Sequence, residues 1–332
     1  MSEFENLVEV KHLKEYFPIN TGMFKTTPLK AVDDVSFAIR KGETLGLVGE
    51  SGCGKTTVGR TLLHLYKPTD GEIWFEGKQV VTKQDILEYR KKSAMVFQDP
   101  YSSLNPRMTV SDIIAEPLDV HKLYSSKAER QEKVLELMAR VGLNSEHASR
   151  YAHEFSGGQR QRVGIARALS VNPRLVICDE SVSSLDVSVQ AQVLGLLEDL
   201  QQEYNISYLF IAHDLSAVKH ISDRIVVMYV GKVVEICETE ELYSRPMHPY
   251  TEALLGSVPK LIADKSVRKA TLEGEVPDPS RPPEGCFFHP RCRYATEECK
   301  KCDMKLIPVN PDDPMGHRTT CIRYKELSLK GV

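Results

Sequence analysis

The sequence feature that most constrains the fold is a glycine-rich loop between an apolar strand and a helix. Residues 49–56 read Gly-Glu-Ser-Gly-Cys-Gly-Lys-Thr and fit the pattern G-x-x-x-x-G-K-[ST]. The apolar run Thr44–Val48 precedes this loop, and Val58–Leu65 follows it with a helical pattern. Glycines let a backbone wrap closely around an anion, and free amides at a helix N-terminus then face that anion. The sequence therefore predicts an α/β chain with a phosphate-binding loop.

The side chains at the end of this loop fit a nucleotide triphosphate and its metal ion. Lys55 supplies a positive charge for the β- and γ-phosphates, and the Thr56 hydroxyl is a Mg²⁺ ligand. The alternative is a glycine-rich turn without a ligand, which the strand–loop–helix context disfavours. The expected nucleotide-binding residues of the loop and the helix start are Gly49, Glu50, Ser51, Gly52, Cys53, Gly54, Lys55, Thr56 and Thr57.

Two acids end a second apolar strand about 130 residues further along the chain. The run Leu175–Cys178 is followed by Asp179 and Glu180. Ligands of α/β sheets bind at the carboxyl ends of the strands, where carboxylates can be accommodated. Asp179 fits a ligand of the Mg²⁺ ion or its water, and Glu180 fits the base that orients or deprotonates an attacking water. A simple strand end is the alternative, and the phosphate-binding loop argues against it.

The remaining sequence shows how the chain is organised. Residues 1–90 read as strands and turns leading into one helix, and residues 100–165 read as helical, with Ser125–Val141 the clearest case. Residues 170–235 alternate strands and helices, which is typical of a parallel sheet covered by helices. Five prolines at positions 277, 279, 282, 283 and 290 exclude long regular elements from the tail.

Charge and hydropathy exclude other classes of protein. The net charge of −3 argues against broad nucleic-acid binding, which needs clustered Lys and Arg. The N-terminus has no apolar segment typical of a secretory signal. No apolar run approaches the ~18–20 residues of a membrane helix. We therefore expect any work at a membrane to proceed from the cytosolic side and through partners.

Five of the eight cysteines lie close together in the tail, between Cys286 and Cys321. In a cytosolic chain such clustering indicates a metal before a disulfide. Only Cys299 and Cys302 have the short spacing that is typical of zinc sites, and the wider spacings suit a larger cluster. A [4Fe–4S] cluster is the preferred interpretation, with Zn²⁺ and no metal as the alternatives.

From residue 5 to about residue 255 the chain resembles the ABC ATPase family. Residues 155–159 match the family signature LSGGQ, with Phe155 in place of Leu, and open a helix that runs to Leu169. Gln98 follows the apolar run Ala94–Phe97 and matches the Q-loop glutamine. Residues 183–186 match the D-loop, and His213 follows the run Leu209–Ala212 and matches the switch histidine.

This resemblance implies a role for each matched residue. Gln98 would be a Mg²⁺ ligand that also senses the membrane subunit, and His213 would contact the γ-phosphate. Phe17 has the best spacing for an aromatic that stacks on the base, with Tyr16 as the runner-up. The implied catalytic residues are Glu180, His213 and Gln98, and the implied Mg²⁺ ligands are Thr56, Gln98 and Asp179. The signature residues implied to face the ATP of an opposite subunit are Ser156, Gly157, Gly158 and Gln159, and Asp186 of the D-loop is implied as a further nucleotide-binding residue.

One local departure from the family pattern follows the catalytic glutamate. Ser181 stands where related sequences often have Pro. Serine should be tolerated there, but the rigidity of the loop between Glu180 and the D-loop is then an open question.

The tail resembles the C-terminal extension of oligopeptide and dipeptide permease ATPases. The matching run is residues 285–292, Gly-Cys-Phe-Phe-His-Pro-Arg-Cys, followed by Cys299 and Cys321. Related dipeptide importers carry a [4Fe–4S] cluster in a similar extension, which implies Cys286, Cys292, Cys299 and Cys321 as ligands. Cys302 is an extra thiol that could replace Cys299. The role expected for the cluster is structural, without nucleotide contact, because the phosphate-site motifs all precede residue 215.

The resemblance implies a P-loop ATPase with a mostly parallel sheet core, an antiparallel β subdomain, a helical subdomain at about 100–165 and an irregular Cys-rich extension. It implies an ATPase domain over residues 1–255 and the extension over residues 256–332. The implied function is that of the motor subunit of an importer for oligopeptides or dipeptides, at the cytoplasmic face of the membrane. The runs at residues 46–55 and 97–108 look more like F-type than D-type subunits.

The implied partners are a D-type ATPase subunit, two transmembrane permeases and, indirectly, a peptide-binding protein, with no nucleic acid. Two alternatives remain open. An importer motor for nickel or another small solute would resemble this chain to about residue 255 but usually stops sooner. A nucleic-acid- or ribosome-associated ABC ATPase usually has two cassettes or long insertions.

Overall fold

The computed structural model describes residues 5–22, 25–183, 185–257, 272 and 274–332. The chain forms two compact units. The first unit comprises the described residues up to Val8, residues 39–44 and residues 74–212. The second unit comprises the described residues of 9–38, 45–73 and 213–332. Each unit therefore combines segments that lie far apart in the sequence.

Three parallel strands form the centre of the first unit. Strand β7 (Leu175–Asp179) lies between β6 (Ser93–Val96) and β8 (Ser207–Ile211), with Leu175 opposite Ser93 on one side and Ser207 on the other. Every residue of β7 and β8 is buried. Strands that are covered on both faces need apolar side chains on both, which explains their nearly continuous apolar sequence.

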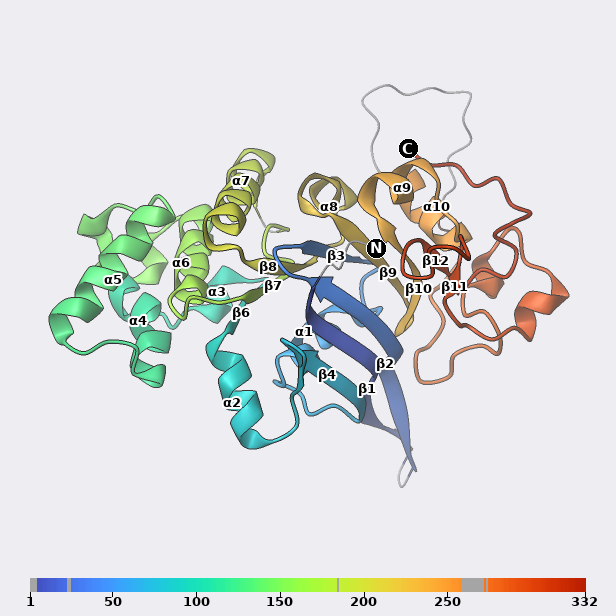
Figure 1. The fold of residues 1–332 in the computed structure, drawn as a ribbon, viewed down its shortest axis with the longest axis horizontal. Coiled ribbons are helices and arrows are strands. Elements are labelled where there is room, and N and C mark those ends of the chain that lie inside the picture. The colour runs from blue at the N-terminus through green and yellow to red at the C-terminus, as the bar shows by residue number, and fades with distance from the viewer. Residues whose placement is uncertain (1–4, 23–24, 184, 258–271, 273) are drawn as a thin grey trace. The chain divides into compact units, whose positions relative to one another are not determined.

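Helices make up most of the rest of the first unit. The clearest predicted helix is α5 (Lys127–Arg140), which begins after Ser126, whose side chain accepts a hydrogen bond from the Glu129 amide. Val134 and Met138 are fully buried on its inner face. In Figure 1 the helices α4, α5 and α6 lie together, coloured green. The other helices of this unit are α2 (Lys83–Lys91), α3 (Pro100–Ser103), α4 (Val110–His121), α6 (Gly157–Leu169) and α7 (Val187–Tyr204).

The interpretation of residues 1–90 as containing one helix is incomplete. The described part of that segment contains α1 (Lys55–Leu62) and α2. The start of α2 had a sequence signal, because Thr82 and Asp85 form a capping box. The Thr82 amide donates to the Asp85 carboxylate at 2.9 Å, and the Asp85 amide donates to the Thr82 hydroxyl at 3.1 Å. The mean hydropathy of α2 is low, and only Tyr89 of this helix is buried, which made its helical pattern weak.

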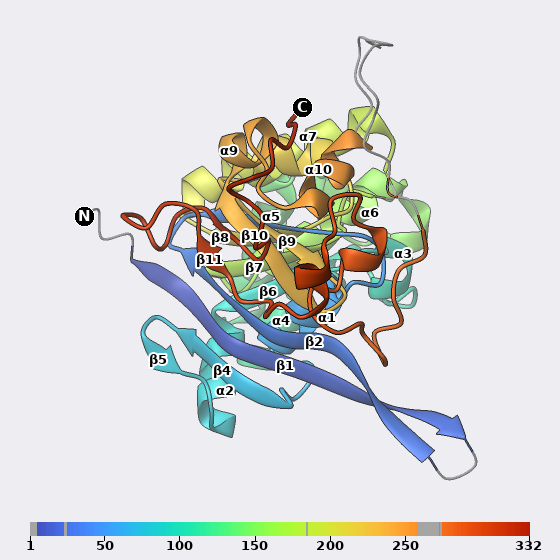
Figure 2. The same ribbon diagram turned by 90° about the vertical axis from the view of Figure 1, so that its right-hand side faces the viewer.

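The second unit contains both parallel and antiparallel strands. Strand β9 (Arg224–Tyr229) is parallel to β3 (Thr44–Val48) and antiparallel to β10 (Lys232–Glu238). Figure 2 shows the long strands β1 (Asn6–Gly22) and β2 (Lys25–Arg40) side by side. In this sheet β1 lies between β2 and β4 (Asp70–Phe75), and β5 (Lys78–Gln79) pairs antiparallel with the end of β4. The helices of this unit are α1, α8 (Leu215–Ile221), α9 (Thr239–Ser244) and α10 (Pro249–Gly256).

The described part of the tail has only short elements, as its prolines predict. These are the single turns η3 (His289–Arg291) and η4 (Glu297–Lys300) and the short strands β11 (Ile307–Pro308) and β12 (Arg318–Thr319). Strand β12 pairs antiparallel with β10, with Thr319 opposite Glu235. The tail is therefore joined by main-chain pairing to the sheet of the second unit.

The search for membrane spans gave a negative result. Among the helices of the described residues, none has both the length and the apolar character that a membrane crossing requires.

Candidate functional site

The glycine-rich loop is held in a backbone shape that other residues cannot adopt. Gly49 and Gly54 have φ angles of 151° and 106°. A Cβ atom at Gly49 would lie 2.3 Å from the Met228 carbonyl oxygen, and one at Gly54 would lie 2.1 Å from that of Ala31. Both approaches are shorter than atomic contact allows. The loop therefore depends on glycine at these two positions, as the sequence pattern predicts.

The lysine of the loop lies inside the curve of its own backbone. Lys55 is 4% exposed, and its Nζ donates to the carbonyl oxygens of Gly49 at 2.8 Å and Glu50 at 3.0 Å. Helix α1 begins at Lys55, so its free amides lie at the same end as this ammonium group. Thr56 and Thr57 are half-buried in the first turn, and Ser51 and Gly52 are exposed at the tip of the loop. This arrangement suits an anion.

The two aromatic candidates for base stacking differ in their surroundings. Successive residues of a strand face opposite sides, so Tyr16 and Phe17 of β1 cannot share a face. The Tyr16 hydroxyl donates to Asp33, which fixes that ring. Phe17 is half-buried and packs edge-on against Tyr66, with 5.3 Å between the ring centroids.

In the first unit the structure brings two of the predicted catalytic side chains together. Gln98 donates from Nε2 to the Glu180 Oε2 atom at 2.9 Å. Asp179 is the last residue of β7 and is 1% exposed, whereas Gln98 is exposed just after β6. Because β6 and β7 are parallel neighbours, their carboxyl ends lie at one edge.

The backbone of Glu180 has an uncommon conformation. Its φ angle is 46°, in the left-handed region that residues other than glycine rarely adopt. The Glu180 amide donates to the Ile211 carbonyl oxygen at 2.9 Å, which ties this residue to the end of β8. The Glu180 carbonyl oxygen accepts from the Ser183 amide at 3.2 Å and the Ser183 hydroxyl at 2.9 Å. These bonds hold the loop in which Ser181 replaces the usual proline.

The rest of the predicted D-loop leads into helix α7. Ser184 lies outside the described residues. Asp186 caps α7 by accepting from the Val189 amide at 3.0 Å and the Ser188 hydroxyl at 2.7 Å. These hydrogen bonds hold the pKa of Asp186 below its usual value.

The predicted signature forms the start of helix α6. Ser156 caps the helix, and the Gln159 side chain accepts from the Ser156 amide at 3.0 Å. Ser156 is exposed, whereas Phe155 is 4% exposed. Phe155 thus fills an apolar position of the core, which explains why it can replace Leu. Gly157 and Gly158 follow in the first turn of α6, whose free amides can face an anion.

His213 lies in the second unit, between β8 and helix α8, and its side chain is exposed. The next residue, Asp214, caps α8 by accepting from the Ser216 amide at 2.8 Å. Lys55, Thr56 and His213 thus belong to the second unit, whereas Gln98, Asp179 and Glu180 belong to the first.

The tail cysteines line one cavity. Cys286, Cys292, Cys299, Cys302 and Cys321 surround it together with residues such as His248 and Phe288. Burial raises the pKa of Cys286 and of Cys321 to about 12, and backbone amides at their sulfurs act in the opposite direction. Buried thiols that converge on one cavity become good ligands when a cation stabilises their thiolates. The donor set thus fits a thiophilic metal.

One detail of the geometry bears on which of two neighbouring thiols, Cys299 or Cys302, is the better ligand. Cys299 Sγ accepts from the Thr296 amide at 3.5 Å, whereas Cys302 Sγ donates to the Cys299 carbonyl oxygen at 3.4 Å. An acceptor sulfur is the better ligand, since a ligand thiol must lose its proton.

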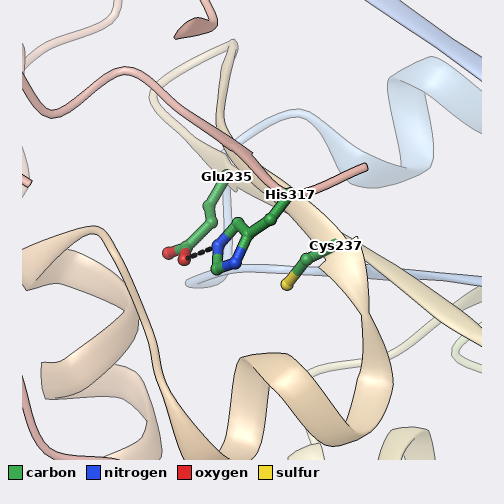
Figure 3. A group of neighbouring side chains, drawn as sticks. All are labelled: Glu235, Cys237 and His317. Carbon is green, nitrogen blue, oxygen red and sulfur yellow. Dashed lines mark hydrogen bonds and ion pairs between the residues drawn. The ribbon is translucent and has the colours of Figure 1, made fainter. Parts of the chain in front are cut away.

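A second polar cluster joins the tail to the sheet, and the sequence did not reveal it. Glu235 of β10, Cys237 and His317 are all buried, and their ligand-type atoms lie within 4.8 Å of one another. Figure 3 shows the three side chains pointing toward one another, with a contact between Glu235 and His317 that measures 2.7 Å. Glu235 also accepts from the amides of Met247 at 2.6 Å and His248 at 3.1 Å. Since these donors occupy both carboxylate oxygens, the cluster is a structural network.

A third contact that the sequence did not reveal joins the tail to the phosphate loop. Arg291 forms two contacts with the Glu50 carboxylate, at 2.7 Å and 3.0 Å. Arg291 lies next to the predicted ligand Cys292, 241 residues from Glu50. Pairing over such a separation has no signal in a single sequence. The sequence predicted no contact between the cluster and the nucleotide, and it gave no indication of this contact between the cysteine segment and the phosphate loop.

Comparisons with protein families support the sequence interpretation. Residues 32–183 match the family model described as "ABC transporter". Residues 234–299 match the model described as "Oligopeptide/dipeptide transporter, C-terminal region". The second match covers Cys286, Cys292 and Cys299 together with most of the sheet strand β10.

Several curated proteins are similar over most of the chain. The oligopeptide transport ATP-binding protein AppF of Bacillus subtilis is 53% identical over 327 residues, which are 96% of this chain and 98% of that protein. The oligopeptide transport ATP-binding protein OppF of the same organism is 60% identical, over 77% of this chain and 83% of that protein. The dipeptide transport ATP-binding protein DppF of Haemophilus influenzae is 50% identical, over 87% of this chain and 89% of that protein.

Solved structures with a similar fold are also ATP-binding cassettes. One is a dimeric cassette in a post-hydrolysis state bound to ADP and Pi, with 26% identity and a TM-score of 0.63 over 70% of this chain and 98% of that chain. Another is cbiO1 of Clostridium perfringens, part of the ABC transporter complex cbiONQ. It has 25% identity and a TM-score of 0.62 over 72% of this chain and 91% of that chain.

Proposed function

The chain belongs to the family of ABC transporter ATP-binding proteins that includes oligopeptide and dipeptide transport subunits, and from this we propose that it is the motor of a peptide importer. Like its family, the chain binds and hydrolyses ATP. The observation that carries the peptide assignment is the match of residues 234–299 to the C-terminal region of oligopeptide and dipeptide transporters. A motor for nickel or another small solute would not require this region.

We assign the binding of ATP to the phosphate loop and its helix. Lys55 would leave its carbonyl partners for the β- and γ-phosphates, and the amides of residues 49–57 would surround the phosphate oxygens. Thr56, Gln98 and Asp179 would hold Mg²⁺, whose oxygen ligand preference these side chains meet. Phe17 would stack on the base, since the Tyr16 hydroxyl is already bound to Asp33.

We assign hydrolysis to Glu180 with the help of Gln98 and His213. The 2.9 Å contact between Gln98 and Glu180 supports a shared position at the attacking water. The left-handed backbone at Glu180 directs its carboxylate away from the path of β7, which is the kind of local strain that functional sites store. His213 would contact the γ-phosphate.

We assign the exposed start of α6 to a nucleotide held by another subunit. Gly157 and Gly158 lie in the first turn of α6, where main-chain amides have no acceptor within the helix, and the Ser156 hydroxyl caps only its own helix. A chain with both a phosphate loop and such an exposed helix start completes its sites by dimerisation. The partner that fits an F-type subunit is a D-type paralogue, and the remaining partners are two membrane permeases and a substrate-binding protein. The motor would act at the cytoplasmic face of the membrane.

We assign residues 1–255 to the ATPase domain and residues 256–332 to its Cys-rich extension. Cys286, Cys292, Cys299 and Cys321 would hold a [4Fe–4S] cluster, with Zn²⁺ as the alternative. Such a group would supply a covalent link between segments that have few apolar residues of their own. The convergence of the thiols on one cavity and the acceptor role of Cys299 support this ligand set.

The test of the peptide assignment uses the assembled transporter. Vesicles that contain this chain, its paralogue and the two permeases should accumulate labelled oligopeptide when ATP and the binding protein are present. Vesicles with Glu180→Gln in this chain should not. ATP-dependent uptake of nickel with no uptake of peptides would contradict the proposal.

A further inference from the structure

An arginine of the Cys-rich extension forms a close ion pair with the phosphate loop. Arg291 Nη1 lies 2.7 Å from Glu50 Oε2, and Arg291 Nη2 lies 3.0 Å from Glu50 Oε1. The two side chains are 4% and 22% exposed. Paired contacts between a guanidinium and a carboxylate fix orientation as well as distance, and this pair is largely shielded from water. Glu50 is therefore held from the side of the extension.

Other contacts hold the same part of the loop. The Glu50 amide donates to the Tyr250 hydroxyl at 2.8 Å, so this amide and the carboxylate are both used by the second unit itself. Arg291 Nη1 also lies 3.3 Å from the Tyr229 hydroxyl. Phe288 packs against the rings of Tyr229 and Tyr250, with centroid distances of 5.3 Å for both. An arginine and an aromatic from the tail thus pack against two tyrosines, one of which binds the Glu50 amide.

The lysine of the phosphate loop contacts the main chain of Glu50. Lys55 Nζ donates to the Glu50 carbonyl oxygen at 3.0 Å. Glu50 is thus bound through its carboxylate to Arg291, through its amide to Tyr250 and through its carbonyl to Lys55. A change in the position of Glu50 would move the carbonyl group beside the Lys55 ammonium and the neighbouring amides. Those are the groups that must be ordered in advance to bind phosphates tightly.

We propose that Arg291 is a positioning residue for the phosphate loop, through which the Cys-rich extension sets the affinity of the chain for ATP. This inference rests on the nucleotide site proposed above. Arg291 does not touch the nucleotide, and it acts by holding Glu50. Because Arg291 is adjacent to Cys292 and only five residues from Cys286, the order of the cysteine segment is transmitted to the loop through one side chain.

The extension offers a matched control, because a second arginine forms a similar pair away from the loop. Arg293 Nη2 lies 2.8 Å from Glu252 Oε2 in helix α10. Glu252 is 4% exposed and also accepts from the Tyr294 hydroxyl and the Lys330 amide. Removing Arg293 therefore weakens the attachment of the same extension to the second unit without touching Glu50.

The experiment measures binding of a fluorescent ATP analogue to the full-length chain with its cysteine segment intact. Arg291→Ala should weaken binding by about 10- to 100-fold, the range that small misplacements of a site produce. Arg291→Lys keeps the charge but loses the paired geometry, so an intermediate loss is expected. Arg293→Ala should stay within about twofold of wild type, as expected for a change that does not couple to the site. The thermal midpoint and the metal content of each variant report on folding.

A double-mutant cycle tests whether Arg291 acts through Glu50. Glu50→Gln alone should weaken binding, and adding Arg291→Ala should then cost little more, because the pair is already broken. Independent, additive losses would overturn the proposal, and so would wild-type affinity in Arg291→Ala. An equal loss in Arg293→Ala would also overturn it, since it would indicate general loosening of the extension. Failure of the wild-type chain to bind ATP, or of Lys55→Ala to weaken binding, would instead contradict the nucleotide site itself.

Discussion

At the scale of single residues, neighbouring groups determine the surroundings of each charged side chain of the proposed nucleotide site. Glu180 follows the buried Asp179 and has a positive φ angle, so its carboxylate leaves the direction of β7 and reaches Gln98. Lys55 is buried in its own loop, where three polar atoms surround its ammonium group. Two acids in sequence thus have different environments, one inside the sheet and one at its edge.

The first prediction concerns the base. Glu180→Gln should keep ATP binding and lose turnover by about 10²- to 10⁴-fold, because the amide keeps the shape but cannot take a proton. Lys55→Ala should differ by weakening nucleotide binding itself. The measurements are equilibrium binding and steady-state phosphate release in the assembled transporter. Glu132→Gln, at an exposed position of α5, serves as the control. If Glu180→Gln hydrolysed ATP at nearly the wild-type rate, the assignment of Glu180 as the base would be wrong.

At the scale of elements, short strands attach the extension to the main sheet. Strand β12 pairs antiparallel with β10. His317 directly precedes β12, and its ring contacts Glu235 of β10. Burial alone would lower the pKa of His317, but the hydrogen bonds that its ring donates to the Glu235 and Glu241 carboxylates outweigh burial and raise that pKa above 6.5. The charged pair thus stabilises the attachment of the tail.

The second prediction is a pH dependence that follows from His317. A group with a raised pKa in the folded state contributes its full stability below its unfolded value, and this contribution is lost as the pH rises through the folded value. Stability of the tail should therefore decrease from about pH 6 toward higher pH in the wild type. His317→Gln should remove this slope and destabilise the chain by about 3–5 kcal/mol, because it leaves Glu235 buried without its partner.

The measurement for this prediction is the thermal midpoint across that pH range, with proteolysis of the tail as a second readout. His220→Gln, at an exposed position of α8, controls for the loss of any histidine. The same slope in wild type and His317→Gln would show that another group causes it.

The third prediction also belongs to the extension. Protein purified without oxygen should be brown and contain about four irons and four sulfides per chain. Cys299→Ser should lose this iron, whereas Cys302→Ser should keep it, because only Cys299 has an accepting sulfur beside the Thr296 amide. Metal analysis and the visible spectrum check the outcome. The reverse result would assign the third ligand to Cys302, and one bound zinc without sulfide would replace the cluster.

At the scale of the whole molecule, the proposed function makes the nucleotide site of one chain depend on a second chain. The signature residues Ser156 to Gln159 lie in the first unit, and the phosphate loop lies in the second. A solved cassette of similar fold is dimeric and holds ADP and Pi. We therefore expect activity to depend on association.

The fourth prediction is that the isolated chain is mainly monomeric and a poor ATPase. Specific activity should rise with protein concentration, and it should rise more steeply when the D-type paralogue is added. Ser156→Arg should abolish this gain and keep nucleotide binding by the monomer, because it blocks only the exposed start of α6. Robust hydrolysis that does not depend on concentration would contradict the prediction.

The sequence alone was enough to predict the elements that carry the chemistry. Loop 49–56 and the acids after β7 were predicted from local patterns, because strands and glycine turns depend on neighbouring residues. Gln98 after β6 and the helix after Ser156 were identified through the resemblance to the ABC ATPase family. The helix α2 was missed because its apolar face is small. Periodicity detects a helix only when enough of it is buried.

Only the tertiary structure decided how the tail meets the rest of the chain. The ion pairs of Arg291 with Glu50 and of His317 with Glu235 join residues 241 and 82 positions apart. The convergence of five cysteines on one cavity likewise depends on the path of the chain through β11 and β12. Ion pairs and cavities form between surfaces that come together in space, so the spacing of residues in one sequence does not determine them.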